Sequence, residues 1–245
     1  LDKGVISFAL CRALFVEGTE IEIHGEHLAG GKVTDAEFHM SFFGPQLTIT
    51  YQYITSTGRS LQMARKQVKI SGFRGVREIS KMPIRPMTPA IKDQLTQRGR
   101  LFAAIGVGAH YMQYQGMMGV KKWWSWDMMR ADGRMMVDPG TYTQFVDEYG
   151  LRDDDDLDVD TVAEEDMWMT DPYIRGFSFA TKQWGRFAVD NIREMEYRDD
   201  AFDKLVLAED KKTLIRALVD ARGATMTDAI RLIVAGLIEI GRAHV

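Results

Sequence analysis

Residues 37–54 read EFHMSFFGPQLTITYQYI and contain two apolar segments separated by Gly44-Pro45. Within residues 47–54, apolar and aromatic side chains alternate with threonine and glutamine. Alternation with a period of two is typical of a strand that buries one face. Glycine followed by proline favours a turn. The stretch therefore predicts a hairpin in which strands Glu37–Phe43 and Leu47–Ile54 flank a turn at Gly44-Pro45.

The strand pattern extends on both sides of this hairpin. An alternating run over residues 21–24 precedes it, and an apolar segment over residues 61–70 follows after Gly58. Three prolines between residues 83 and 89 then end the pattern, because proline cannot donate a hydrogen bond to a sheet. We expect a strand-rich region up to about residue 87.

A helix is predicted directly after this region. Thr88 suits the capping position, and Pro89 suits the first turn. Apolar residues recur at helical spacing and would form one buried face: Ile91, Leu95, Phe102 and Ile105. Gly106 would then end the helix.

The rest of the chain predicts further strands and helices around an acidic segment. Residues 151–160, LRDDDDLDVD, are expected to form an exposed linker, because like charges repel and little apolar surface is available to bury. The other expected elements are a strand through Met135–Val137, a short helix after Pro139, a helix over 162–169, buried strand positions at Phe177, Phe179, Phe187 and Val189, and a helix over Ala208–Arg222.

Together these patterns predict an α+β fold. A strand-rich region is followed by a mixed α/β region and a final entry helix. We expect a domain over residues 1–150, the acidic linker over 151–160 and a connector over 161–238. Residues 239–245 are expected to be an artefact, because Ile240–Val245 match the translation of a common sequencing adapter. The first residue, Leu1, similarly suggests an internal fragment.

Composition narrows the class of protein. The chain has 245 residues, 45% hydrophobic and 27% charged, as in a folded domain with a sizeable core. It has no run of eighteen apolar residues and no secretory signal, so we expect neither a membrane span nor secretion. A single cysteine, Cys11, excludes an internal disulfide and favours a reducing, intracellular compartment, either cytoplasmic or nuclear.

The net charge of −4 conceals two regions of opposite sign. Residues 59–100 contain eleven lysines or arginines and two acids, whereas acids dominate residues 153–171. A basic region can meet nucleic acid, an acidic partner or only water. The sequence leaves these alternatives open.

Six segments, in order, carry a resemblance to one family. They are ALFVEGTEI (13–21), VKISGFRGVREISKMPIRPM (68–87), RGRLFAAIGVGAHYMQYQG (98–116), DGRMMVDPGTY (132–142), GFSFATKQWGRFAVDNI (176–192) and AFDKLVLAEDKK (201–212). The set resembles the uncharacterised N-terminal region of fungal-type AAA+ ATPases, a domain of unknown function. The last two segments resemble the entry to the ATPase core. Residues 24–65 match this pattern least well.

The resemblance implies a P-loop ATPase that binds ATP and Mg²⁺, but this chain lacks the loop itself. No G-x-x-x-x-G-K-[ST] string occurs, so we expect the fragment alone not to hydrolyse ATP and leave the enzyme class of the chain open. The resemblance also implies contacts with its own AAA+ core, a homo-oligomeric parent and an unidentified protein substrate. Leu205, Val206 and Leu207 match the edge of an adenine pocket, or they simply pack against the helix over 208–222.

An aromatic and basic cluster is the strongest candidate for binding outside the resemblance. Trp123, Trp124 and Trp126 follow Lys121 and Lys122, a combination that can stack bases and hold phosphates. With the neighbouring methionines Met117, Met118, Met128 and Met129, the same residues can instead form a protein-docking patch or part of a core. Core packing is favoured, protein docking comes second, and nucleic acid is the least favoured.

The sequence disfavours two candidate metal sites. His24 and His27, with Glu22, Glu26 and His39 nearby in sequence, would point to opposite faces of a strand. The acidic segment offers Asp154, Asp156, Asp158, Asp160 and Glu165 at calcium-loop spacing, but Val159 replaces the required glycine.

No nucleophile elbow of the form G-x-S-x-G is present, and Asp138 and Asp190 are expected to be structural. The sequence therefore favours a regulatory or substrate-engaging N-terminal region of an AAA+ ATPase. The alternative is a stand-alone module that binds protein or nucleic acid.

Overall fold

The computed structural model describes residues 4–123, 125–146, 157–159, 162–195 and 206–221. The chain divides into two units, residues 1–195 and residues 196–245. The strands are β1 (Val5–Ser7), β2 (Glu20–His24), β3 (Leu28–Ser41), β4 (Gly44–Ser56), β5 (Leu61–Ser71), β6 (Val76–Glu78), β7 (Ile84–Pro86), β8 (His110–Lys121), β9 (Trp126–Val137), β10 (Leu157–Val159), β11 (Tyr173–Ser178), β12 (Gln183–Ala188) and β13 (Ile192–Arg193). The α-helices are α1 (Pro89–Ile105), α2 (Pro139–Phe145) and α3 (Glu209–Ala221), and the 3₁₀ helices are η1 (Phe8–Leu14), η2 (Ile79–Lys81), η3 (Glu164–Met169) and η4 (Val189–Asn191).

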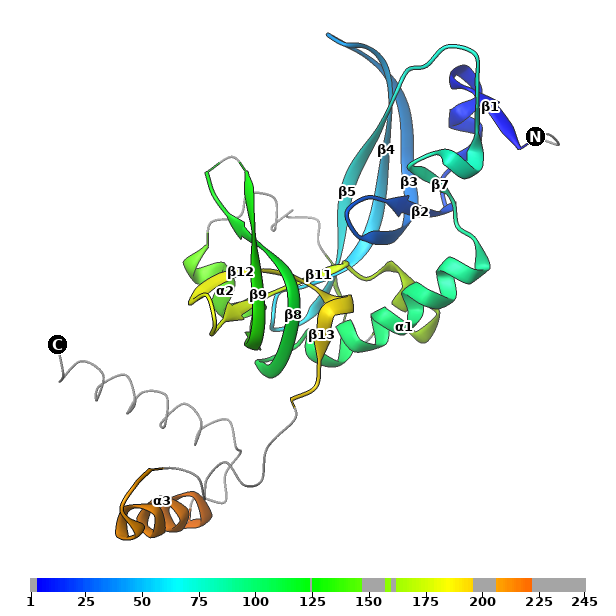
Figure 1. Ribbon diagram of the computed structural model, residues 1–245. Coiled ribbons are helices and arrows are strands. Elements are labelled where there is room, and N and C mark those ends of the chain that lie inside the picture. The colour runs from blue at the N-terminus through cyan, green and yellow to red at the C-terminus, as the bar shows by residue number, and fades with distance from the viewer. Residues whose placement is uncertain (1–3, 124, 147–156, 160–161, 196–205, 222–245) are drawn as a thin grey trace. The chain divides into compact units, whose positions relative to one another are not determined.

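The predicted hairpin is the centre of an antiparallel six-stranded sheet. Its strand order is β10-β5-β4-β3-β2-β7, and β4 pairs with β5 along its length (Figure 1). The turn between β3 and β4 is at Phe42 and Phe43, two residues earlier than predicted, while Gly44 and Pro45 belong to β4. The sequence signal identified the hairpin correctly, but it placed the turn on the glycine and not on the residues before it.

A second sheet closes on itself. Its strand order is β12-β11-β9-β8-β13, and β12 also pairs with β8, so that β8, β9, β11 and β12 form a closed ring. Inside this ring, Tyr114 and Phe187 pack edge to face with ring centroids 5.0 Å apart. Met118 and Met135 are fully buried beside them.

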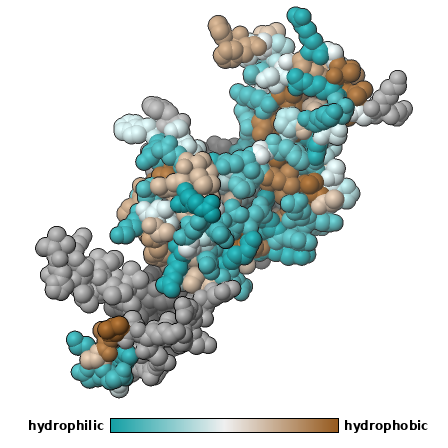
Figure 2. All heavy atoms as spheres, viewed as in Figure 1, coloured by the Kyte–Doolittle hydropathy of each residue, from teal (hydrophilic) through white to brown (hydrophobic). Residues whose placement is uncertain are grey.

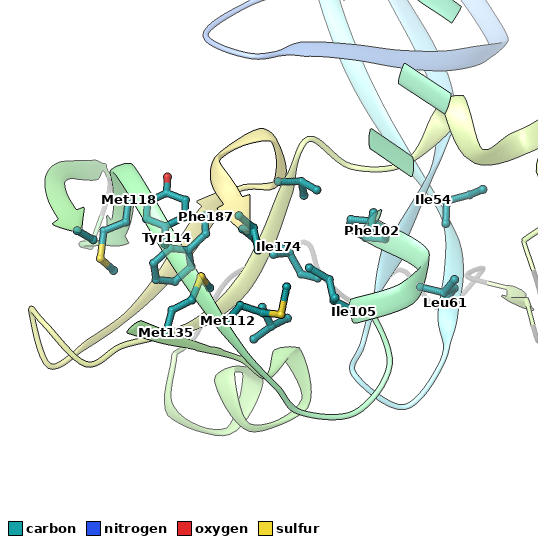
Figure 3. Packing of buried hydrophobic residues seen from close by; sticks show 14 of the residues in the cluster. Ile54, Leu61, Phe102, Ile105, Met112, Tyr114, Met118, Met135, Ile174 and Phe187 are labelled. Atoms are coloured by element: carbon teal, nitrogen blue, oxygen red, sulfur yellow. The ribbon is translucent and has the colours of Figure 1, made fainter. Parts of the chain in front are cut away.

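One apolar cluster joins the closed sheet to the six-stranded sheet. Figure 3 shows it running from Met118 and Tyr114 through Ile174 and Ile105 to Phe102 and Ile54. The cluster therefore combines residues from β4, α1, β8 and β11. A separate cluster lies under β1 and η1 and includes Cys11, which is buried and not in a disulfide.

Helix α1 packs against η3, which lies between α1 and β3. Two glycines permit this close approach. A Cβ atom added to Gly30 of β3 would lie 2.7 Å from the Trp168 carbonyl oxygen, and one added to Gly99 of α1 would clash with the Met167 backbone. Trp168 is consequently one of the largest fully buried side chains in the described part of the chain.

The α+β class predicted from the sequence is confirmed. Strands dominate the described residues, α1 begins at Pro89 as expected, and α3 covers most of the predicted final helix. Part of the expected acidic linker differs, because Leu157–Val159 form strand β10, which pairs with Leu61–Met63 of β5. None of the described helices has the length and apolar character needed to cross a bilayer.

Candidate functional site

The end of the β3–β4 hairpin carries four apolar side chains that we call the arm tip: Phe38, Met40, Phe42 and Phe43. They are exposed by 43%, 81%, 98% and 91%, in that order. Ser41 holds the turn, because its hydroxyl donates to the Gly44 carbonyl at 2.7 Å and accepts from the Phe43 amide at 3.2 Å. The rings of Phe42 and Phe43 pack edge to face with centroids 5.5 Å apart, so the turn presents both of them together.

Through Phe38, the arm tip packs against further aromatic side chains. Phe38 packs against Phe8 of η1 with centroids 5.3 Å apart, and Phe8 packs against Phe73 at 5.6 Å. Figure 2 shows apolar atoms gathered at the upper end of the molecule, over the end of this hairpin. A contiguous exposed apolar patch is typical of an interaction site. This patch was not predicted, although paired phenylalanines beside a hairpin turn are a sequence signal from which it could have been.

The tryptophan cluster is divided between core-like packing and exposure. Trp123 lies at the end of the β8–β9 hairpin and is 89% exposed, whereas Trp124 lies outside the described residues. Trp126 is half-buried, with the Lys121 ammonium 5.3 Å and the Arg186 guanidinium 4.2 Å from its ring centroid. Arg186 is also 4.4 Å from the Tyr173 ring. Trp126 therefore packs within the protein, and Trp123 alone faces solvent among the described tryptophans of this cluster.

The neighbouring methionines are similarly divided. Met118 is fully buried and Met129 packs against the core, while Met117 and Met128 are 43% and 37% exposed. A methionine-rich docking patch thus has two exposed members, one on each strand of the hairpin.

The basic region over residues 59–100 is largely paired within the molecule. Six of its eleven cations form ion pairs: Lys66, Lys81, Arg85, Lys92, Arg98 and Arg100. Arg77 packs over the Phe73 ring. Arg59, Arg65, Lys69 and Arg74 are exposed and have no ion-pair partner among the described residues. The positive charge available for binding is therefore concentrated on β5 and the turns beside it.

Glu22 of β2, which the sequence offered only as a candidate metal ligand, is a buried carboxylate. It is 0% exposed, and it accepts hydrogen bonds from Arg85 Nε, from the Thr88 amide at 3.0 Å and from the Thr88 hydroxyl at 2.9 Å. His24 Nε2 lies 2.9 Å from it. Thr88 precedes α1 as predicted, but its hydroxyl binds Glu22 and does not cap the helix. Burial alone would raise the pKa of Glu22, but these hydrogen bonds outweigh it and lower the pKa to about 2.

Glu22 should make the stability of the fold depend on pH in the acid range. Its pKa is depressed in the folded state, so its contribution is fully present above the unfolded value of 4.5 and is lost as the pH falls from there to about 2. The shift corresponds to about 3 kcal/mol. We expect Glu22→Gln to lower the free energy of unfolding at pH 6 and to flatten its dependence on pH, measured by urea unfolding. Glu20→Gln is the matched control, because Glu20 lies on the same strand as Glu22 and is a partly exposed carboxylate that pairs with Lys92 of α1. An equal effect of both variants would contradict the assignment.

A second buried polar cluster lies between the two sheets. Asp171 is 2% exposed and accepts hydrogen bonds from Lys66 Nζ at 3.3 Å and from the Tyr173 amide at 3.1 Å. Burial would raise its pKa, but Lys66 and Arg175 outweigh burial and lower it. Arg98 is also buried and donates to the Leu28 and Thr170 carbonyls. These groups hold η3 and β11 against β3 and β4 and form a structural cluster.

The candidate metal ligands have different contacts in the structure. His24 contacts Glu22, the His27 ring packs on Tyr173 with centroids 5.1 Å apart, and exposed His39 lies 3.6 Å from Glu37. Within the described ranges, no three His, Cys, Asp or Glu residues are grouped to hold a metal. In the calcium-like segment, Asp154, Asp156 and Asp160 lie outside the described residues.

Asp138 and Asp190 were expected to be structural, and both have contacts within the protein. The predicted adenine-pocket positions stay untested. Asp138 caps α2, because its carboxylate accepts the Thr141 amide at 2.9 Å, and Asp190 lies 3.8 Å from Arg98. Leu205 lies outside the described residues. Val206 and Leu207 belong to the second unit and are 100% and 40% exposed, so their role as the edge of an adenine pocket stays a prediction.

Comparison with known proteins gives one match. Residues 1–90 match the family model of a domain of unknown function, DUF7025. The matched part covers β1 to β7, including the arm tip and β5. Neither a curated protein nor a solved structure matches the chain.

Proposed function

We propose that this chain is the regulatory or substrate-engaging N-terminal region of an AAA+ ATPase, and that the arm tip contacts the protein substrate. The exposure of Phe42 and Phe43 is the observation that carries the contact with protein. Full burial of a phenylalanine contributes roughly 1.5–3 kcal/mol, which favours covering both rings with a partner. The ordered resemblance over six segments supports the link to an ATPase.

In this proposal the chain supplies recognition, and a neighbouring core supplies ATP hydrolysis. The core would bind ATP and Mg²⁺ through a P-loop that this chain does not contain. A homo-oligomer would present several arm tips around one assembly, which raises the effective affinity for an extended or unfolded substrate. The second unit, with Leu205, Val206 and Leu207, would lead into the core.

The arm tip is tested by binding of an unfolded protein. We expect the chain to bind reduced, carboxymethylated α-lactalbumin carrying a fluorescent label, measured by anisotropy. The Phe42→Ser, Phe43→Ser double variant should bind at least about tenfold more weakly, because 1.4 kcal/mol of lost burial is a factor of ten. The fold should be unaffected, since both side chains are exposed.

The matched control is Leu10→Ser with Val16→Ser, which removes two exposed apolar side chains near η1. Equal weakening by both double variants would contradict a specific role of the arm tip.

The ATPase link is tested separately. We expect no phosphate release by the isolated chain, and ATP hydrolysis by the product of the uninterrupted gene, whose sequence should contain a G-x-x-x-x-G-K-[ST] string. Its absence from that gene would overturn the link.

A stand-alone nucleic-acid-binding module is the second candidate, and the exposed Trp123 beside Lys122 favours it. Such binding would depend steeply on salt, because phosphate contacts release counterions. Measurable affinity for a fluorescent oligothymidine that falls with salt and with Trp123→Ala would favour this candidate over protein binding.

A further inference from the structure

We infer that the free edge of β5, residues 64–71, is a docking site for an extended acidic peptide that adds to the sheet as a strand. This inference goes beyond the proposed function and does not depend on a link to an ATPase. It rests on the unpaired edge, on its charge and on the strand that already occupies its neighbouring residues.

Among the described residues, one edge of β5 is unpaired along most of the strand. On one side, β5 pairs with β4 from Leu61 to Ser71. On the other side, β10 pairs only with Leu61–Met63. Within the described part of the chain, no strand pairs with this side of β5 from Ala64 to Ser71. An unpaired edge presents backbone N–H and C=O groups that can bind another strand.

The basic side chains along this edge favour a ligand that carries negative charge. Arg65, Gln67 and Lys69 are exposed and share one face of the strand, because alternate residues point the same way. Arg65 and Lys69 have no ion-pair partner among the described residues, whereas Lys66, on the opposite face, already pairs with Asp171. A ligand strand with acidic side chains on the matching face would place carboxylates opposite two free cations.

The same charges argue against pairing of two copies of the chain. Edge-to-edge contact of two β5 strands would bring Arg65 and Lys69 of each copy together, and like charges directly opposite each other are destabilising. Arg65 and Lys69 would also favour a ligand strand with acidic side chains over a neutral or basic one.

The chain itself shows that the β5 edge accepts a strand. In β10, Leu157 lies opposite Met63, Asp158 opposite Gln62 and Val159 opposite Leu61, all in antiparallel register. The ligand would continue the sheet beyond β10. Backbone pairing is available to a peptide and not to a nucleic acid, so the occupied part of this edge favours a peptide ligand.

The test uses the whole chain and a labelled peptide of alternating aspartate and valine, as long as residues 64–71. We expect saturable binding by fluorescence anisotropy, and slower hydrogen exchange of the β5 amides in the complex. Arg65→Glu with Lys69→Glu should weaken binding about tenfold or more. The same variant should gain affinity for a lysine–valine peptide. Both residues are exposed, so unfolding curves should stay close to those of the unmodified chain.

Three controls keep the result specific. Lys121→Glu with Lys122→Glu removes equal charge from the β8–β9 hairpin and should leave peptide binding intact. An aspartate peptide interrupted by prolines keeps its charge but cannot pair as a strand, and it should bind weakly. The Phe42→Ser, Phe43→Ser variant should bind the acidic peptide normally, which separates this inference from the proposed function.

Several outcomes would overturn the inference. They are equal binding of the proline-interrupted peptide, tighter binding of an oligothymidine at the same residues, or equal weakening by the two charge-reversed variants.

Discussion

Replacement of Gly99 by alanine should lower the free energy of unfolding by about 2–4 kcal/mol, although alanine normally stabilises a helix. In an exposed helix interior, the same change stabilises by roughly 1 kcal/mol. At Gly99 of α1, however, an added Cβ would lie 2.6 Å from the Met167 carbonyl carbon and closer still to its oxygen, where ordinary contact begins at 3.4 Å. The backbone of η3 would have to move, and buried Trp168 would move with it.

Urea unfolding followed by tryptophan fluorescence and by circular dichroism measures this effect. Gly25→Ala is the matched control, because the nearest atom to its added Cβ is the His27 carbonyl oxygen at 3.8 Å. A rise in stability for Gly99→Ala would show that α1 and η3 are farther apart than in this structure. Gly30→Ala should resemble Gly99→Ala, since its added Cβ would lie 2.7 Å from the Trp168 carbonyl oxygen in the same helix η3.

Replacement of Asp171 by alanine should cost about 2–3 kcal/mol, because it removes a buried carboxylate that accepts hydrogen bonds from the Lys66 ammonium and the Tyr173 amide. Asp171→Asn keeps the shape and can still accept the Tyr173 amide, so it isolates the loss of charge. We expect a smaller loss for asparagine than for alanine. Because the pKa of Asp171 is lowered in the folded state, its contribution to the free energy of unfolding depends on pH. The contribution is present above the ordinary pKa range of an aspartate and is lost as the pH falls below that range.

The control for Asp171 is an exposed ion pair. Glu164 and Arg100 form a salt bridge with side chains 58% and 59% exposed, and Glu164→Ala should change stability by less than about 1 kcal/mol. A double-mutant cycle of Asp171→Asn with Lys66→Met then measures their coupling. Additive effects would mean that Lys66 does not stabilise the carboxylate.

Local patterns were sufficient to predict much of the fold. Alternation over residues 47–54 predicted β4, and the apolar face of residues 91–105 predicted α1. The turn of the arm tip was misplaced, because Gly44-Pro45 is a strong local signal and the hydrogen bonds of Ser41 that fix the turn are not visible in the sequence.

Long-range pairing accounts for what the sequence did not predict. The Lys66–Asp171 bond joins residues 105 positions apart, and the contact of Arg85 with Glu22 spans 63 positions. Strand β10 similarly lies in a segment whose aspartates suggested a linker, and its pairing with β5 depends on a partner far away in the chain. Because no local period encodes such contacts, Glu22 and Asp171 were recognisable as buried groups only in three dimensions.

The apolar cluster shared by the two sheets has a consequence for folding during synthesis. Ile54 and Leu61 belong to the matched residues 1–90, but the buried cluster that contains them also includes Trp168, Met169 and Ile174. When synthesis has reached residue 90, the six-stranded sheet still lacks β10 and the apolar residues that η3 and β11 contribute to this cluster. The residues of β5 that pair with β10 would stay unpaired until residues 157–159 have been synthesised, so the nascent chain is a natural client for chaperones.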